Sequence, residues 1–249
     1  MPALRSNART SFVSFSGVDG AGKSTQIEAL RDRLRQDGLE VRVIRFWDDI
    51  ARLTRFREAA GHTIFKGDKG VGTPSAPINR KDKNIKAWPM TALRVFLYFL
   101  DAISTRRAVR DALGSGADLV IFDRYIYDEL VNLPVCSRWG RSYIRLIMSL
   151  VPRPHISYLL DASPEKARAR KPEYPLEFIR TNRQSYMDLV GLIGGITVID
   201  ALPLMKVTEA IIASTHRELS LNVAPRVVDG DRASEESRAA AELSRARVC

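Results

Sequence analysis

Cysteine and long apolar runs are scarce in this chain. Only Cys136 and Cys249 occur among 249 residues, and their separation fits neither a disulfide framework nor a zinc site. No apolar run approaches the roughly 20 residues that a membrane-spanning helix requires. The N-terminal sequence lacks the apolar segment of a secretory signal. These absences predict a cytoplasmic protein without a membrane span.

Acidic residues are outnumbered by basic ones. The chain has 39 lysines and arginines against 29 aspartates and glutamates, which gives a formal net charge of +10. Such an excess attracts polyanions, of which nucleic acid is one. However, the sequence has no alternation of aromatic and basic residues on which bases could stack. Because phosphate-binding enzymes also need basic clefts, we expect a small phosphorylated partner rather than nucleic acid.

The apolar segments alternate between the period of a strand and that of a helix. Strand-like runs cover 12–16, 40–46, 118–122, 156–160 and 195–199. Helical patterns cover 25–34, 89–113, 144–150, 164–171, 176–192 and 204–219. This alternation predicts an α/β fold, with a doubly wound five-stranded parallel sheet flanked by helices.

Three stretches lack this pattern and bound the predicted domain at 11–222. Residues 1–10 are expected to be a flexible N-terminus. Residues 61–86 carry many glycines, prolines and lysines, which predicts a long surface loop. Residues 223–249 are rich in charged residues, serine and alanine, which is typical of a disordered or frayed helical tail.

One motif matches its consensus at every position. Residues 17–24 read GVDGAGKS, which fits G-x-x-x-x-G-K-[ST] between a predicted strand and a predicted helix. The glycines permit a tight loop whose backbone N–H groups converge on phosphate oxygens at the positive end of a helix. Lys23 is expected to reach the β- and γ-phosphates of ATP, and Ser24 to ligate Mg²⁺. The predicted nucleotide-binding residues of this loop are Gly17, Asp19, Gly20, Ala21, Gly22, Lys23, Ser24 and Thr25.

An acid and a base follow the third predicted strand. Ligands of parallel sheets bind at the carboxyl ends of the strands, so Asp123 and Arg124 are expected beside the phosphates. Asp123 is suited to hold Mg²⁺ directly or through water, and Arg124 to clamp a phosphoryl group. Alone, such a pair would indicate a salt bridge, but its place beside the glycine loop favours a functional role.

A basic stretch follows the fourth predicted strand. Ser163 is a plausible N-cap for a helix that carries Arg168 and Arg170. Phosphoryl transfer requires positioning and cancellation of charge, and a mobile arginine lid provides both. We therefore predict a small basic lid at about 166–177. The alternative is an ordinary solvated helix face.

Together, these features resemble the thymidylate kinase family of nucleoside-monophosphate kinases, from about residue 11 to residue 219. The resemblance rests on 17–25, 123–125, 160–161 with Arg168 and Arg170, and 199–201. It implies a P-loop NTPase-type fold, ATP and Mg²⁺ as cofactors, and a possible homodimer formed through the long helix from Pro89.

The resemblance also implies roles for single residues. Asp19 would approach the sugar of the acceptor, and Arg124 would bridge donor and acceptor phosphates. Asp200 and Ala201 would pass near the adenine of ATP. Because Gly20 stands where some members carry an arginine, the catalytic arginines would be those of the lid, Arg168 and Arg170, acting with Lys23 and Arg124.

Departures from the family pattern fall on the acceptor side. Residues 45–49 read RFWDD where the family usually has an Arg-Glu-Pro turn. The thymine-site Asp-Arg pair appears as Asp101-Ala102, and the continuation 125–128 reads YIYD instead of the usual serine-containing sequence. We assign Asp101 and Tyr125 to the acceptor site, and we interpret these changes as those of a divergent branch.

Three functions are consistent with these features. The first is phosphoryl transfer from ATP to a nucleoside monophosphate, with dTMP and ATP giving dTDP and ADP. The second is a kinase of a nucleoside, sugar or sugar phosphate, in which Trp47, Trp88 or Tyr98 could stack on a ring. The third is a non-enzymatic, nucleotide-gated protein that binds nucleic acid, in keeping with the basic excess.

Overall fold

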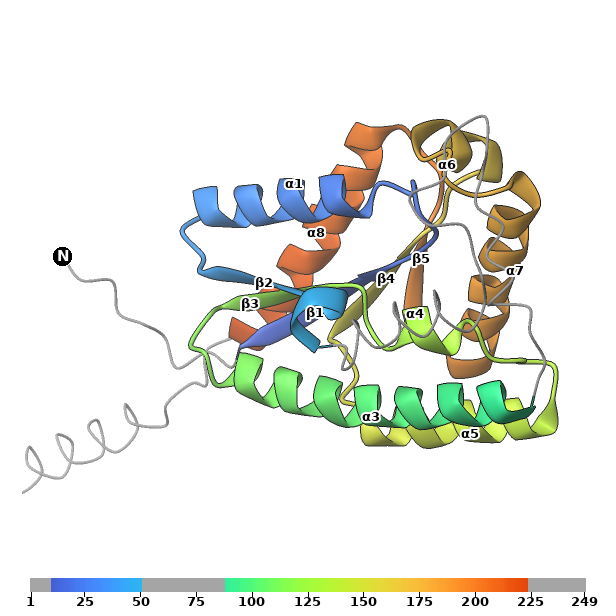
Figure 1. Ribbon diagram of the computed structural model, residues 1–249. Helices are drawn as coiled ribbons and strands as arrows, with labels where there is room; N and C mark the ends of the chain where they lie inside the picture. The colour runs from blue at the N-terminus through green and yellow to red at the C-terminus, as the bar shows by residue number, and fades with distance from the viewer. Residues whose placement is uncertain (1–9, 51–87, 224–249) are drawn as a thin grey trace, which may run out of the picture.

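A computed structural model describes residues 10–50 and 88–223 of the chain (Figure 1). The predictions for residues 1–9, for the loop at 61–86 and for the tail from residue 224 lie outside these residues. In the part of the chain that is described, no helix combines the length and the apolar character needed to cross a membrane.

Five parallel strands form one sheet, as the sequence predicts. They are β1 (Ser11–Ser16), β2 (Val41–Arg45), β3 (Leu119–Asp123), β4 (Ile156–Leu160) and β5 (Ile196–Ile199). Their order is β2-β3-β1-β4-β5, so β1 lies at the centre with β3 on one side and β4 on the other. The loop after β1 therefore leaves the sheet where the winding changes direction, which is where open α/β sheets bind ligands.

Helices cover both faces of the sheet (Figure 1). On one face lie α1 (Lys23–Gln36) and α8 (Leu204–Val223), and on the other lie α3 (Trp88–Leu113) and α5 (Arg138–Leu150). Near the carboxyl ends of the strands are α6 (Pro164–Arg170) and α7 (Leu176–Ile193). The doubly wound arrangement is therefore confirmed.

The strand side chains explain why both faces are covered. Along β1, Phe12 packs with the α3 side of the core, whereas Val13 and Phe15 pack with the α1 and α8 side. In β3, Ile121 and Phe122 alternate in the same way, and both are fully buried. A strand that is apolar in both directions requires a cover on each face, as parallel sheets generally do.

Some local structure was not foreseen from the sequence. A five-residue π-helix, η1 (Phe46–Ile50), follows β2, and the Asp49 carboxylate accepts a hydrogen bond from Arg45 N at 2.8 Å. A one-turn helix, α4 (Tyr127–Leu130), follows β3. Both are too short to show a hydrophobic period. By contrast, the predicted cap of α6 is confirmed, because the Ser163 side chain accepts a hydrogen bond from Lys166 N at 3.2 Å.

Candidate active site

The glycine loop between β1 and α1 is packed backbone to backbone against two neighbouring segments. A Cβ atom on Gly17 would lie 2.6 Å from the carbonyl oxygen of Leu160, at the end of β4. A Cβ on Gly20 would lie 2.3 Å from the carbonyl oxygen of Ala167 in α6. Both glycines have positive φ angles, of 139° and 83°. The N-cap of α1 is Gly22, which has no side chain to cover the first-turn N–H groups, so the loop fits a phosphate cradle.

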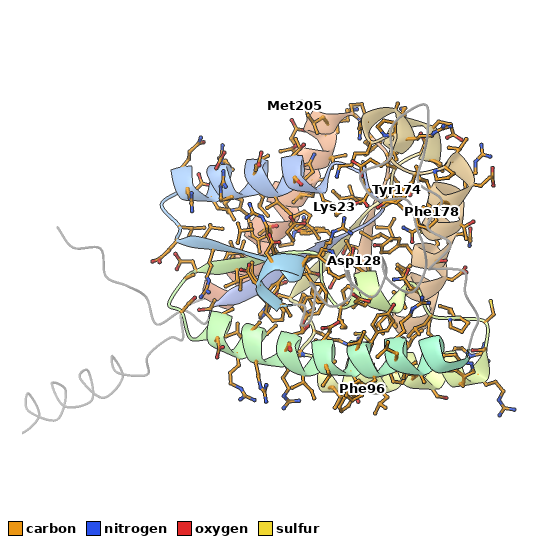
Figure 2. The ribbon with its side chains drawn as sticks, viewed as in Figure 1. Lys23, Phe96, Asp128, Tyr174, Phe178 and Met205 are labelled. Carbon is orange, nitrogen blue, oxygen red and sulfur yellow. The ribbon has the colours of Figure 1, made fainter. Side chains whose placement is uncertain are left out.

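Lys23 is buried at the centre of this loop. Its side chain is only 6% exposed, and Nζ donates hydrogen bonds to Gly17 O at 2.7 Å and Val18 O at 3.0 Å. Burial, with repulsion from Arg124, lowers the pKa of Lys23 from the usual 10.5 to about 8. In Figure 2, Lys23 lies inside the molecule, whereas Met205 lies on its rim.

Arg124 holds its guanidinium beside the same loop. Its φ is +69°, in the left-handed region that non-glycine residues rarely adopt, and its backbone N–H donates to Phe15 O at 2.9 Å. Nη2 donates to the carboxylate of Asp19, and Nη1 donates to Asp128 Oδ1 at 3.2 Å. Burial opposes the charge, but these two carboxylates outweigh it and raise the pKa of Arg124, so the guanidinium stays charged.

Two carboxylates predicted for the site have opposite pKa shifts. Burial acts to raise the pKa of Asp19, but the charges of Arg124 and Lys23 lower it overall. For Asp123, at the end of β3, burial prevails over the same two cations and raises the pKa. The carboxylate of Asp19 also accepts a hydrogen bond from Arg124, which favours its charged form.

The donor set around the loop suits Mg²⁺. Ser24 and Thr25 are exposed in the first turn of α1, and Asp123 ends the adjacent strand β3. Among residues 10–50 and 88–223, no group of three or more His, Cys, Asp or Glu side chains is placed to hold a metal ion. One hydroxyl and one carboxylate fit Mg²⁺, because this ion usually keeps several waters and binds phosphate oxygens instead of an all-protein cage.

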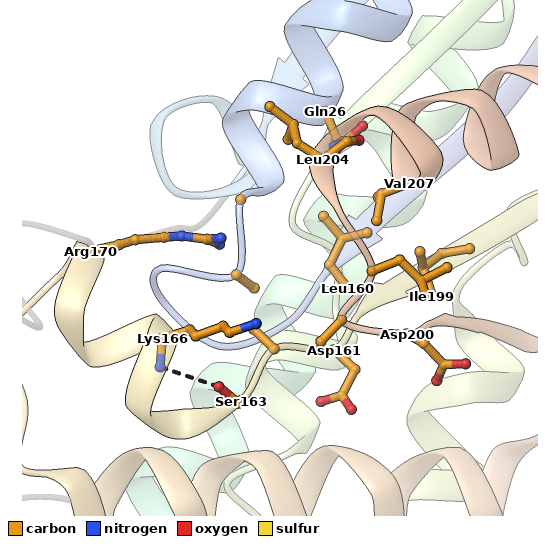
Figure 3. Close-up of a pocket in the computed structure, with 15 residues that line it drawn as sticks. Gln26, Leu160, Asp161, Ser163, Lys166, Arg170, Ile199, Asp200, Leu204 and Val207 are labelled. Atoms are coloured by element: carbon orange, nitrogen blue, oxygen red, sulfur yellow. Dashed lines mark hydrogen bonds between the residues drawn. The ribbon is translucent and has the colours of Figure 1, made fainter.

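The two predicted lid arginines in α6, and two further arginines in α7, have different partners. Arg170 extends from α6 towards the glycine loop, where Nη1 donates to Gly20 O at 3.2 Å (Figure 3). Arg168 is half-buried on the same helix. Arg180, in α7, pairs with Glu165 and Glu177 at the surface. Arg183 forms two hydrogen bonds of 2.6 Å to the carboxylate of Asp161, which ties α7 to the end of β4.

A pocket opens beside the loop (Figure 3). Its walls come from the ends of β4 and β5, the start of α8, α6 and the glycine loop. Leu160, Ile199 and Val207 contribute apolar surface, and the predicted residues Asp200 and Ala201 form part of the wall. An apolar slot with a few polar groups at its edge is suited to a nucleobase.

Two of the residues assigned to the acceptor, Asp101 and Tyr125, are fully buried. Tyr125 is fully buried, and its hydroxyl donates to Pro152 O at 2.5 Å, so its side chain lies in the core and not in the site. Asp101 is fully buried in α3. Partial burial of the Tyr143 phenol, together with the negative charge of Asp101, raises the pKa of Tyr143 to about 12. A contact between Asp101 and the acceptor stays a prediction.

The sequence reasoning missed a buried carboxylate. Asp128 lies in α4, four residues after Arg124, and its side chain is 1% exposed. It contacts both Arg124 and Tyr186, which comes from α7. Arg124 precedes α4 and has a left-handed backbone, so the pair is not an i,i+4 pair of one helix, and nothing in the sequence indicated Tyr186.

The central strand, the glycine loop with its buried lysine, and the following helix give the chain a P-loop NTPase-type kinase fold.

No known family model matches the sequence. It is nevertheless similar to a probable thymidylate kinase of Pyrococcus abyssi, with 27% identity over 221 residues, 84% of this chain and 97% of that protein. A thymidylate kinase of Symbiobacterium thermophilum is 29% identical over 185 residues (72% and 75%). One of Bifidobacterium longum is 29% identical over 221 residues (84% and 98%).

Proposed function

We propose that the chain is a kinase of the thymidylate kinase type, which converts dTMP and ATP to dTDP and ADP. The observation that carries the proposal is the convergence of Lys23, Arg124 and Asp19 at the glycine loop between β1 and α1. The similarity to thymidylate kinases over most of the chain supports it. Identities below 30% agree with a divergent branch of that family.

The reaction needs positioning and charge cancellation more than covalent chemistry. A phosphate oxygen of the acceptor attacks the γ-phosphorus of ATP, the bond to the β–γ bridging oxygen breaks, and ADP leaves. The loop N–H groups hold the phosphates, while Lys23, Arg124, Arg168 and Arg170 cancel charge on the transferred group. When bound, Mg²⁺ would neutralise the β- and γ-phosphates, with Ser24 and Asp123 as its protein-side ligands.

The lowered pKa of Lys23 predicts a pH dependence. The ammonium must keep its proton to attract phosphate, and in the free protein it loses that proton near pH 8. We therefore expect kcat/KM for ATP to fall by about tenfold per pH unit above about pH 8, because this parameter reports ionisations of the free enzyme. Initial rates between pH 6.5 and 10 would check this.

Stability moves in the opposite direction in this pH window. Between about pH 8 and 10.5 the unfolded chain keeps the Lys23 proton that the folded chain has lost, so Lys23 makes the free energy of unfolding rise with pH. A fall in rate between about pH 8 and 10.5 would therefore not result from unfolding driven by the titration of Lys23. Thermal melts at each pH provide the control. A profile that stays flat to pH 10 would contradict the lowered pKa of Lys23.

A second candidate is a kinase of another small acceptor. The observation that favours it is the pairing of Arg124, whose guanidinium already contacts two carboxylates, Asp19 and Asp128. Ala102 also stands where the family pattern has an arginine, which removes one cation from the expected phosphate site. A neutral acceptor such as a nucleoside or sugar would need less positive charge there than a nucleotide does.

Release of ADP with a panel of acceptors separates the two candidates. The panel contains dTMP, other nucleoside monophosphates, nucleosides, sugars and sugar phosphates. We expect the highest kcat/KM with dTMP. A higher value with an acceptor that is not a nucleoside monophosphate would favour the second candidate, and release that no acceptor stimulates would contradict both.

The homodimer implied by the family resemblance also stays a prediction. Exposed large apolar side chains on α3 and α5 are compatible with it: Phe96, Phe99, Trp139 and Leu146. Figure 2 shows Phe96 on the outer side of α3. Apolar patches of this kind are common at helix-to-helix interfaces between subunits.

A further inference from the structure

Asp128 is the meeting point of three segments of the core. Its Oδ2 accepts hydrogen bonds from Ser16 Oγ at 2.6 Å and from Tyr125 N at 3.3 Å. Its Oδ1 accepts from Arg124 Nη1 at 3.2 Å and from Tyr186 OH at 2.8 Å. These donors come from the end of β1, the turn after β3, and α7. A buried carboxylate with several donors on its two oxygens is held in one orientation.

The geometry of Arg124 depends on this carboxylate. A φ of +69° lies in the left-handed region, which is unfavourable for a non-glycine residue, so surrounding contacts must hold it. The backbone N–H of Arg124 is fixed by Phe15 O, and the guanidinium is fixed between Asp128 on one side and Asp19 on the other. Asp19 belongs to the glycine loop and is 31% exposed, whereas Asp128 is almost completely buried. Asp128 is therefore the more rigid of the two anchors.

Tyr186 supports the carboxylate from α7. It is 4% exposed, and burial, together with the negative charge of Asp128, holds its pKa well above the usual value. The phenol therefore stays protonated and donates to Asp128. One turn earlier on the same helix, Arg183 binds the carboxylate of Asp161 in the wall of the pocket. The helix α7 is thus fastened at two points, to α4 through Asp128 and to the end of β4 through Asp161.

We propose that Asp128 is a positioning residue that holds the Arg124 guanidinium at the glycine loop, with Tyr186 fixing Asp128 from α7. The proposal rests on the kinase function only through the role of Arg124 at the phosphates. Figure 2 shows Asp128 in the interior of the molecule, and its side chain is 1% exposed, so we do not count it among the groups that contact substrate. Asp128 acts through Arg124, so its loss should lower turnover more than ATP binding.

Two variants test this role. Asp128→Asn keeps the size of the side chain but removes its charge, and we expect kcat with dTMP to fall by about 30- to 100-fold. Tyr186→Phe removes a single hydroxyl, and we expect a fall of about three- to tenfold. In both variants KM for ATP, measured well below pH 8 where Lys23 keeps its proton, should change by less than about threefold, because Lys23 Nζ is held by Gly17 O and Val18 O.

Matched controls separate positioning from stability. Tyr158→Phe also removes a buried hydroxyl, which contacts Ser214 at 2.6 Å and Thr215 at 2.9 Å on the α8 side of the sheet. Asp118→Asn alters a carboxylate that accepts from Glu40 N before β3, at the opposite end of that strand from Asp123. Both controls should keep the parent kcat, even if Tyr158→Phe lowers the melting temperature as much as Tyr186→Phe does.

A spectroscopic readout makes the test independent of the acceptor. In ¹H–¹⁵N spectra of the arginine side chains, a fixed Arg124 guanidinium should give resolved Nη signals, assigned by their loss in Arg124→Lys. We expect these signals to merge or broaden in Asp128→Asn. If the parent shows no turnover stimulated by an acceptor, the kinase proposal fails, and the spectrum alone decides whether Asp128 positions Arg124.

Three results would overturn the positioning role of Asp128. A folded Asp128→Asn protein with unchanged Arg124 signals, or with kcat within about threefold of an active parent, would overturn it. If Asp128→Asn does not fold, Tyr186→Phe decides by the same two readouts. A KM for ATP that rises in parallel with the loss of kcat would assign Asp128 to the architecture of the loop and would also overturn it.

Discussion

Replacing Lys23 with methionine should lower kcat/KM for ATP by about a thousandfold or more. Lys23 Nζ lies inside the loop, and its removal leaves the charge of the transferred phosphoryl group without the lysine cation of that loop. Methionine nearly conserves the volume, and an apolar side chain avoids the cost of burying a charge. The fold should therefore survive, so steady-state kinetics with MgATP and dTMP would report chemistry.

The control for this variant is Lys206→Met, an exposed lysine in the first turn of α8. It should keep the parent kinetics, because its charge lies at the surface. If Lys23→Met retained more than about a tenth of the parent kcat/KM while folded, the glycine loop would not be the phosphate site. The kinase proposal would then lose its main structural support.

Gly20→Ala is expected to lower kcat by about tenfold to a hundredfold through the contact between the glycine loop and α6. The new methyl group would lie 2.3 Å from Ala167 O and 3.0 Å from Ala167 C, both backbone atoms that cannot rotate away. The helix that carries Arg168 and Arg170 would have to move outward, and the hydrogen bond from Arg170 to Gly20 O would be lost. The same contact explains why this chain has no room for a loop arginine at position 20.

Gly38→Ala is a closely matched control. Gly38 has φ of +84°, almost the same as the +83° of Gly20, but a Cβ there would meet no atom within 4 Å. Both substitutions should cost about 1–2 kcal/mol of stability for the left-handed backbone. Only Gly20→Ala should also lose kcat. Equal kinetics for the two variants would show that α6 need not touch the loop during turnover.

The strands were predictable because a strand that is buried on both faces appears in the sequence as a continuous apolar run. The segment 118–122 reads as an apolar run because β3 is covered by helices on each side. The glycine loop was predictable for a related reason, since the backbone contacts of Gly17 and Gly20 exclude every side chain. Burial on both faces of a strand, or a backbone contact that leaves no room for a side chain, restricts the residue type at a position, so the sequence alone predicts the local structure there.

The site contacts that were missed depend on long-range packing. Tyr125 follows Arg124 in sequence, but the left-handed backbone of Arg124 helps send the guanidinium and the phenol in different directions, one to the loop and the other into the core. The pairs Asp128–Tyr186 and Asp161–Arg183 join residues 58 and 22 positions apart. No periodicity or motif encodes such pairs, because they form only when α7 packs against the strand ends.

The transfer of labelled phosphate tests the central claim most directly. The full-length protein is incubated with [γ-³²P]ATP, Mg²⁺ and dTMP, and the nucleotides are separated. We predict that the label moves to dTDP, with one ADP formed for each dTDP, and that Lys23→Met abolishes the transfer. Label that remains in ATP, or that appears only as inorganic phosphate, would contradict phosphoryl transfer to dTMP by this site.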